Sequence, residues 1–196
     1  LFDQFFSGNF PGFRGRSYVN PNEDDIKIGF YTSRSKLYVG ETIIASFSLY
    51  YRNLEQPNFE RHEQEPLEFP FFTSELLPNV NVSFPPKASL NGQEYNIAPY
   101  NREVYALTPL KKGKYQLGVA KFSVEGNPLS YFSPVVKESL KKTVEVLDLP
   151  SPKPNDFSGE VENYNVKLSI DTKNVTVGNP VFFSVQISGE GTGVLF

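Results

Sequence analysis

Large apolar residues occupy every second position in several short segments of this chain, and this alternation limits its possible folds more than any other feature. It is found in the segments 26–30, 43–50, 80–84 and 114–119. A period of two places successive side chains on opposite faces of a β-strand. The sequence therefore predicts many short strands with one inward face each. From the phase of the alternation we expect these residues to be mostly buried: Phe30, Val39, Ile43, Phe47, Leu117 and Val119.

The composition agrees with a chain made of strands. Aromatic residues make up 15% of the 196 residues, and 16 prolines and 14 glycines interrupt the apolar segments. Aromatic and β-branched residues favour strands, whereas Pro and Gly favour turns between them. The one segment with a helical appearance is 135–140, and Pro134 before it limits that segment to a single turn. The predicted fold class is all-β.

Charge and cysteine content exclude several classes of protein. The net charge is −3, so the chain lacks the basic surface that binds nucleic acid, and we expect no nucleic-acid partner. The longest apolar runs have four residues, which is too short for a transmembrane helix. Cysteine is absent, which excludes disulfides, thiolate zinc sites and a cysteine nucleophile. Because Met is also absent and the chain begins at Leu1, we expect it to be a fragment of a longer protein.

An internal repeat relates the segment 26–49 to the segment 164–187. The offset is 138 positions throughout, and Gly40 in the first copy corresponds to Gly178 in the second. Glycine is favoured at such turns because it adopts positive φ without strain. Eight apolar positions correspond: Ile28 with Val166, Phe30 with Leu168, Leu37 with Val175, Val39 with Val177, Ile43 with Val181, Ala45 with Phe183, Phe47 with Val185, and Leu49 with Ile187.

The repeat and a proline-rich stretch together predict the domain organisation. A split first strand followed by a glycine turn and a long strand is typical of immunoglobulin-like β-sandwiches. Alternate prolines at 150, 152 and 154 favour an extended, stiff linker. We therefore expect a Phe-rich connector (1–21), an immunoglobulin-like module called module one (22–148), a Pro-rich linker (149–157), and the first strands of an incomplete second module (158–196).

Several motifs resemble those of the BatD family, the bacterial aerotolerance or oxygen tolerance proteins. The most specific is the stretch Pro-Lys-Pro-Asn-Asp-Phe-Ser-Gly-Glu-Val at 152–161, which is followed by the second Val-Gly turn and the Ser-Gly-Glu-Gly stretch at 188–191. The chain is similar to the family's middle module plus the start of the next one. Further motifs with this resemblance are Leu-Tyr-Val-Gly-Glu at 37–41, Phe-Phe-Thr-Ser-Glu at 71–75, Leu-Thr-Pro at 107–109 and the Phe-rich start at 1–8.

The resemblance implies a function without an active site. Such a protein is anchored in the bacterial membrane, with immunoglobulin-like modules in the periplasm or outside the cell. Its implied partners are BatA- and BatB-like membrane proteins with von Willebrand factor A domains, and its implied role lies in oxidative stress. We therefore expect a non-catalytic scaffold that binds other components of a membrane complex. The alternatives are a surface adhesin built as a tandem immunoglobulin-like array and a carbohydrate-binding accessory domain, although the absence of Trp disfavours the latter.

A search for chemistry among the polar residues predicts no catalytic, cofactor or metal site. The one histidine, His62, lies in the segment 53–65, which we interpret as a solvated loop, and no Gly-x-Ser-x-Gly motif accompanies it. The glycines at 189–193 lack the Lys and Ser/Thr of a phosphate loop. Oxygen ligands at 22–25 and 155–156 are candidates for a junction calcium site, but each cluster has fewer than the about six ligands that calcium prefers.

Exposed aromatic residues and an uncovered strand face are the remaining signals of binding. Phe5, Phe6 and Phe10 in the connector, together with Phe71 and Phe72, are candidate interaction residues, and the alternative for all of them is packing against the module. The strands at 164–187 present an apolar face without a second sheet. We expect that face to pack on module one or on a second copy, which would make the chain a homodimer.

Overall fold

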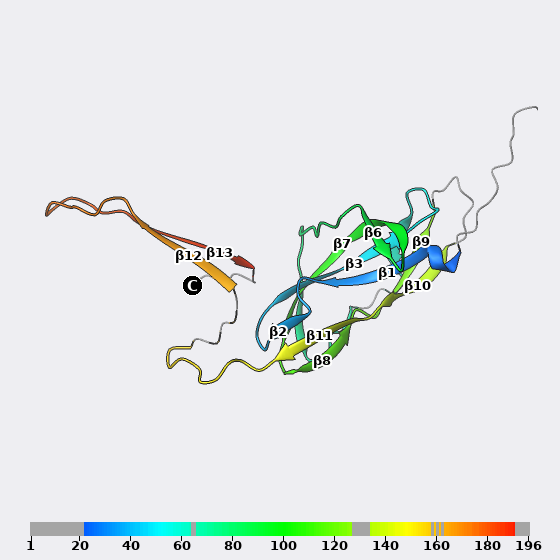
Figure 1. The fold of residues 1–196 in the computed structure, drawn as a ribbon, viewed down its shortest axis with the longest axis horizontal. Coiled ribbons are helices and arrows are strands. Elements are labelled where there is room, and N and C mark those ends of the chain that lie inside the picture. The colour runs from blue at the N-terminus through cyan, green and yellow to red at the C-terminus, as the bar shows by residue number, and fades with distance from the viewer. Residues whose placement is uncertain are drawn as a thin grey trace, which may run out of the picture.

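The computed structural model describes residues 22–63, 66–126, 134–157, 159, 161 and 163–190 (Figure 1). Within these residues the regular elements are strands, apart from the single 3-10 turn η1 (Glu23–Asp25), so the predicted all-β class is confirmed. The strands form one eight-stranded sheet, one three-stranded sheet and one separate hairpin. The first two curl around a shared core, which is consistent with a β-sandwich.

The larger sheet has the order β4-β9-β10-β1-β3-β7-β5, and β6 pairs with β7 beside this path. Its strands are β1 (Ile26–Thr32), β3 (Ile43–Tyr51), β4 (Asn58–Arg61), β5 (Phe72–Leu76), β6 (Lys87–Leu90), β7 (Gln93–Pro109), β9 (Lys121–Glu125) and β10 (Val135–Leu140). The smaller sheet has the order β2-β11-β8, with β2 (Lys36–Tyr38), β8 (Gly113–Leu117) and β11 (Lys142–Leu147).

The chain crosses between the two sheets five times, from β1 to β2, from β2 to β3, from β7 to β8, from β8 to β9 and from β10 to β11. The buried residue Ser139 ties two of these crossings together. Its hydroxyl accepts the backbone N–H of Ala120 at 2.8 Å and donates to the carbonyl of Gly118. Because these backbone groups lie between two sheets and lack a ladder partner there, a serine at this position satisfies them.

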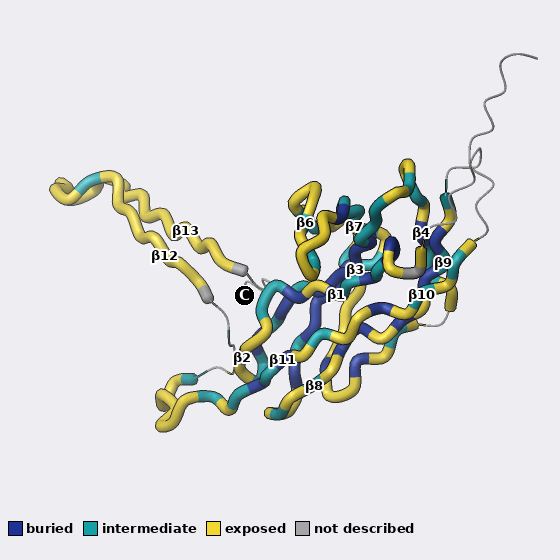
Figure 2. The backbone as a smooth tube through the Cα atoms, turned by 45° about the vertical axis from the view of Figure 1, so that its right-hand side comes forward, coloured by how far each residue is buried: buried dark blue, intermediate teal, exposed yellow. Residues whose placement is uncertain are grey.

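The core lies between the inner faces of β1 and β3 and those of β8, β9 and β11. Phe47 is fully buried at its centre, with its ring centroid 4.8 Å from that of Phe30 and 4.9 Å from that of Phe122. The predicted inward face of the first strands is thus confirmed. In Figure 2 these inner positions are dark blue, and the core includes Ile26, Ile28, Leu37, Ile43, Ala45, Leu49, Leu117, Val124, Val144 and Val146.

Six residues were predicted to be buried. The prediction is wrong for Val119, which is exposed, and Val39 is only half-buried. Val119 is 48% exposed because β8 ends at Leu117 and the alternation stops there. Gly118 has a φ of +82°, and a Cβ on it would lie 2.0 Å from Cγ of Phe30. The Phe30 ring therefore occupies that space, and the chain turns so that Ala120 points inward in place of Val119.

Three other segments differ from the prediction. Residues 135–140 form the strand β10 and have no helical turn, since they pair with both β9 and β1. Residues 80–84 form no strand, because Pro78 precedes them and two prolines at 85 and 86 follow. The segment 53–65 was interpreted as a loop, but it contains β4, whose Phe59 is buried.

The hairpin of β12 (Asn163–Ile170) and β13 (Phe183–Glu190) repeats the pairing of β1 with β3 residue by residue. In module one Ile28 is opposite Leu49. In the hairpin Val166 is opposite Ile187, each 138 positions later. All seven cross-strand pairs of β1 with β3 recur in this way.

The turns and their hydrogen bonds repeat as well. Gly40 and Gly178 both have positive φ, +85° and +97°. The N–H of Ile44 donates a hydrogen bond to Oγ of Ser33 at 3.1 Å. At the equivalent place the N–H of Phe182 donates to Oδ1 of Asp171, also at 3.1 Å. The two long strands and the glycine turn of the predicted repeat are therefore structural equivalents, whereas the short strand β2 has no counterpart, because residues 174–176 form no strand.

The hairpin's apolar face is not covered by module one. Figure 1 shows the hairpin apart from the two sheets, and its residues from Tyr164 to Gly189 are exposed, except for the half-buried Thr172. Of the two covers expected for these strands, packing on module one is therefore wrong, and packing on a second copy stays a prediction. The linker that would have to fold them back is itself exposed from Pro150 to Asp156.

Candidate functional site

An apolar surface lies at the end of module one where β7 turns into β8. We call it the Phe71 surface, and it consists of Phe71, Leu110 and Tyr115. Phe71 is 58% exposed and Leu110 is 61% exposed, and the N–H of Leu110 donates to the carbonyl of Phe71 at 2.9 Å. The ring of Phe71 packs on that of Tyr115 with centroids 5.6 Å apart. Two exposed apolar side chains are thus held side by side on a half-buried ring.

The backbone holds Phe71 outward at a conformational cost. The N–H of Phe72 donates to the carbonyl of Phe69 at 3.0 Å, which closes a turn with Pro70 and Phe71 at its centre. Phe71 has a φ of +67°. Pro followed by a residue with positive φ is the pattern of a type II turn, where glycine is the favoured third residue. A side chain there costs about 1–2 kcal/mol, so a phenylalanine at this position favours a binding role.

The Phe71 surface adjoins the point where the second unit begins. The N–H of Gly40 donates to the carbonyl of Pro109 at 3.0 Å, which places the turn between β2 and β3 beside the end of β7. Glu41 forms an isolated parallel bridge with Val161, just before β12. This end of module one therefore already contacts the start of the second unit.

The candidate interaction residues have different outcomes. Phe72 is only 8% exposed, and its ring packs edge-on against Tyr115, so its assignment to an interaction surface is wrong. It is the first residue of β5, and the strand's pleat points it inward. Phe71 is exposed as an interaction residue requires. Phe5, Phe6 and Phe10 lie outside the described residues.

Leu110 and Tyr115 were not predicted as parts of this surface. The sequence predicts the tight turn near Gly113 but contains no signal that the turn lies against Phe71, which is nearly forty positions away. The Tyr115 hydroxyl lies 2.8 Å from the carbonyl of Lys111, which folds this turn onto its ring.

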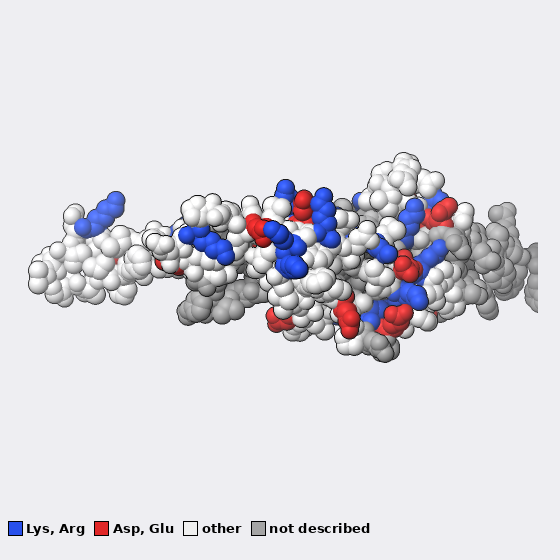
Figure 3. Space-filling view, turned by 90° about the horizontal axis from the view of Figure 1, so that it is seen from below, with Lys and Arg blue, Asp and Glu red and all other residues white. Residues whose placement is uncertain are grey.

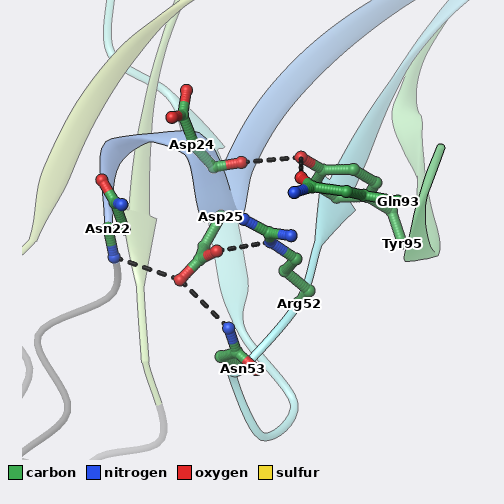
Figure 4. Close-up of polar contacts among 7 residues, drawn as sticks. All are labelled: Asn22, Asp24, Asp25, Arg52, Asn53, Gln93 and Tyr95. Carbon is green, nitrogen blue, oxygen red and sulfur yellow. Dashed lines mark hydrogen bonds and ion pairs between the residues drawn. The ribbon is translucent and has the colours of Figure 1, made fainter. Parts of the chain in front are cut away.

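A network centred on the Asp25 carboxylate closes the opposite end of β1 (Figure 4). One carboxylate oxygen accepts a hydrogen bond from Nε of Arg52. The other accepts hydrogen bonds from the backbone N–H of Asn22 at 3.1 Å and from Nδ2 of Asn53 at 3.2 Å. Nearby, the Tyr95 hydroxyl donates to the carbonyl of Asp24 at 2.8 Å. This network joins η1, β7 and the segment that follows β3.

The network leaves the Asp25 carboxylate engaged with protein donors. Burial would raise the pKa of Asp25, but hydrogen bonds from Asn53, Arg52 and Asn22 outweigh it, and the pKa is lowered from its ordinary value of 3.8. Since both oxygens accept hydrogen bonds, the structure supports a structural role for the candidate calcium cluster at 22–25. At 155–156, Asn155 and Asp156 are exposed in the linker.

A bulge in β7 carries a second polar cluster. The pairing with β3 jumps from Val104 to Tyr100, which leaves residues 101–103 unpaired. Glu103 in this bulge accepts Nε of Arg61 at 2.9 Å and the Tyr105 hydroxyl at 3.0 Å. Burial, followed by the charge of Glu103, raises the pKa of Tyr105. Tyr105 therefore stays protonated as a donor, and the cluster ties β4 to β7.

The remaining polar candidates show no catalytic arrangement. His62 is exposed, and its backbone N–H donates to the carbonyl of Lys121 at 2.8 Å. A shallow pocket of about 310 Å³ lies beside β2, but its buried carboxylate, Glu41, is bound by Arg34 and by the N–H of Tyr38. Across the described part of the chain, no three His, Cys, Asp or Glu residues converge as metal ligands. The same residues include no helix that is long and apolar enough to cross a membrane.

A comparison of the chain with known protein families found no match, and a comparison with curated proteins found none either. The resemblance to BatD therefore stays a prediction from the motifs.

Proposed function

We propose that this chain is part of a non-catalytic extracytoplasmic scaffold, in which tandem immunoglobulin-like modules bind other proteins of a membrane complex. The observation that carries the proposal is the structural repeat. The same strand pair, glycine turn and side-chain cap occur on both sides of a Pro-rich linker. Repeated sandwich modules joined by stiff linkers are suited to holding binding surfaces at a fixed spacing.

The path of the first strand supports the immunoglobulin-like assignment. β1 pairs antiparallel with β3 in the larger sheet, whereas β2 pairs parallel with β11 in the smaller one. A first strand that divides between both sheets of a sandwich was the feature expected of an immunoglobulin-like module. The kink lies near Ser33, whose N–H donates to the carbonyl of Ile44 at 2.8 Å.

The Phe71 surface is the proposed binding surface of module one. Its exposed aromatic ring is rigidly placed, and aromatic side chains in such positions are enriched at protein interfaces. The proposed partners are the BatA- and BatB-like membrane proteins with von Willebrand factor A domains. The motif at 152–161 and the order of the other motifs support this choice of partners. The same motifs support the proposal that the full-length protein has an extracytoplasmic location and a membrane anchor.

A capture experiment with detergent-solubilised membranes of the source organism tests this function. The immobilised chain should retain von Willebrand factor A-domain proteins, identified by mass spectrometry. Phe71→Asn removes the ring while keeping a residue that tolerates positive φ, so it should lose that retention without unfolding. Val119→Asn is the matched control, because Val119 is a similarly exposed apolar residue in a loop elsewhere.

Two results would count against the proposal in different ways. Equal retention by Phe71→Asn and Val119→Asn would show that the Phe71 surface is not the binding surface. Retention of no membrane protein by the wild-type chain would contradict the proposed partners.

A further inference from the structure

The turn between β2 and β3 is a fixed surface on module one. The N–H of Gly40 donates to the carbonyl of Pro109 at 3.0 Å, which attaches the turn to the end of β7. The N–H of Glu41 donates to the carbonyl of Tyr38 at 3.1 Å, and the N–H of Tyr38 donates to Oε2 of Glu41 at 2.8 Å. Arg34 binds the same carboxylate, and Glu41 is only 7% exposed. Both the backbone and the side chain of this turn are therefore held in place.

The surroundings of this turn differ from those of its repeat in the hairpin. A Cβ on Gly40 would lie 3.4 Å from Cγ2 of Val161 and 4.0 Å from the carbonyl oxygen of Gly159. Among the described residues, a Cβ on Gly178 would have no atom within 4 Å. Both glycines have positive φ, so each is required by its own turn. The close approach of Gly159 and Val161 is an additional feature of Gly40, which Gly178 does not share.

The chain reaches this turn after a folded stretch at the end of the linker. From Pro150 to Asp156 every residue is exposed. The N–H of Phe157 then donates to the carbonyl of Pro154 at 3.2 Å, which closes a turn. Gly159 follows with a φ of +101°, which glycine adopts without strain, and Val161 is half-buried. The chain therefore leaves module one through the exposed linker and returns to it at Val161.

We propose that the second unit is docked on module one through Gly159 and Val161, and that this contact fixes the direction in which the unit leaves module one. Val161 forms a parallel β-bridge with Glu41, the residue whose side chain is itself held in place. The side chain of Val161 packs beside Gly40, which has no side chain to separate them. Both docking residues belong to the motif at 152–161, so the proposal gives that motif a physical role.

The hairpin offers little charge by which module one could orient it from a distance. In Figure 3 blue and red side chains gather over module one, whereas the end of the molecule that holds the hairpin is mostly white. The contact at Val161 consists of a backbone bridge and an apolar side chain, and both act only between touching groups. The inference goes beyond the proposed scaffold function and does not depend on its partners.

Nitrogen-15 relaxation of the full chain tests the contact. The amides of Gly159 and Val161 should have order parameters of about 0.85, the value of rigid backbone. Val161→Ser removes both methyl groups from the contact with Gly40 and should lower the order parameter of Gly159 to below about 0.6. Val177→Ser makes the same change at a fully exposed valine and should leave Gly159 as it is.

Pulsed electron spin resonance tests whether the contact sets a direction, because the chain has no native cysteine and two spin labels can be placed freely. Gln116→Cys in β8 and Asn165→Cys near the start of β12 place the labels at exposed positions. The doubly labelled chain should show one narrow distribution of label distances. Adding Val161→Ser should broaden that distribution, whereas adding Val177→Ser should not.

Two results would overturn the proposal. An order parameter below about 0.6 at Gly159 in the otherwise wild-type chain would show that the second unit is not docked on module one. A distance distribution that is equally broad with and without Val161→Ser would show that the contact does not fix a direction. Neither measurement involves membrane proteins, so failure of this inference is distinguishable from failure of the proposed scaffold function.

Discussion

The strand pair β1–β3 and the hairpin β12–β13 have the same register and the same turn, but opposite burial. Phe47 is completely buried, whereas Val185, at the equivalent position, is 49% exposed. Phe30 and Leu168 differ in the same way. The two regions therefore share their strand register and glycine turn, which neighbouring residues determine. They differ in burial, which depends on strands from the rest of the fold.

This difference separates two contributions to a β-sheet. Register depends on the alternation of apolar residues and on the turn, and both are local features of the sequence. Burial depends on strands that are distant in the sequence, here β8, β9 and β11 for module one. A two-stranded hairpin without such a cover is only marginally stable in water.

The largest expected effect comes from shortening the equivalent core positions in the two regions. Phe47→Ala should destabilise module one by about 3–5 kcal/mol, because it leaves a cavity in a packed core. Val185→Ala should change the free energy of unfolding of module one by less than about 0.5 kcal/mol, because Val185 lies outside that core. Urea unfolding followed by circular dichroism measures both. A similar loss in the two variants would mean that the hairpin and module one share one core.

Much of the fold was predictable because its signals are local. The alternation identified the buried faces of β1 and β3, and the constant offset of the repeat identified the positions of the hairpin that correspond to them. The glycine turns at 40 and 178 were also correct, since positive φ is a property of a single residue. Phe72, for which packing against the module was the alternative to a binding role, is buried.

The errors fall where a distant contact overrides the local pattern. Val119 continues the alternation of β8 in the sequence, but the chain turns at Gly118, where the Phe30 ring packs, and Val119 is therefore exposed. Residues 135–140 become a strand because β1 and β9 supply partners on both sides. The Phe71 surface combines two turns nearly forty residues apart, so only its phenylalanine was a candidate from the sequence.

A smaller effect is expected where the two regions differ in sequence. The open ends of β1 and β3 are joined by Asp25 and Arg52, whereas the sequence has an uncharged and an acidic residue, Asn163 and Glu190, at the equivalent positions. Asp25→Asn should destabilise module one by about 1–3 kcal/mol at pH 7, since it weakens three hydrogen bonds to a buried carboxylate. Urea unfolding measures the loss. Asp156→Asn, in the exposed linker, is the control and should have no effect.

The pH dependence of the same variant has a definite sign. The pKa of Asp25 is lower in the folded state than its ordinary value of 3.8, so the stability that it contributes is complete above that value. That contribution is lost as the pH falls from 3.8 through the lowered folded-state pKa. Wild-type module one should therefore lose more stability between pH 5 and pH 3 than Asp25→Asn does. Parallel curves for the two proteins would show that the carboxylate is not stabilised in its ionised form.

The smallest effect concerns the two equivalent glycines, and it tests whether the two regions are energetically independent. Gly40→Ala should destabilise module one by about 1 kcal/mol, because alanine is strained at a φ of +85° and its Cβ would lie 3.4 Å from Val161. Gly178→Ala is strained in the same way at +97°, but no atom lies within 4 Å of its Cβ. It should leave the unfolding of module one unchanged and speed hydrogen exchange at Asn179, whose N–H donates to the carbonyl of Thr176 at 3.0 Å. If Gly178→Ala lowered the stability of module one as much as Gly40→Ala does, the hairpin would have to unfold together with module one, and the separation of the two regions would be wrong.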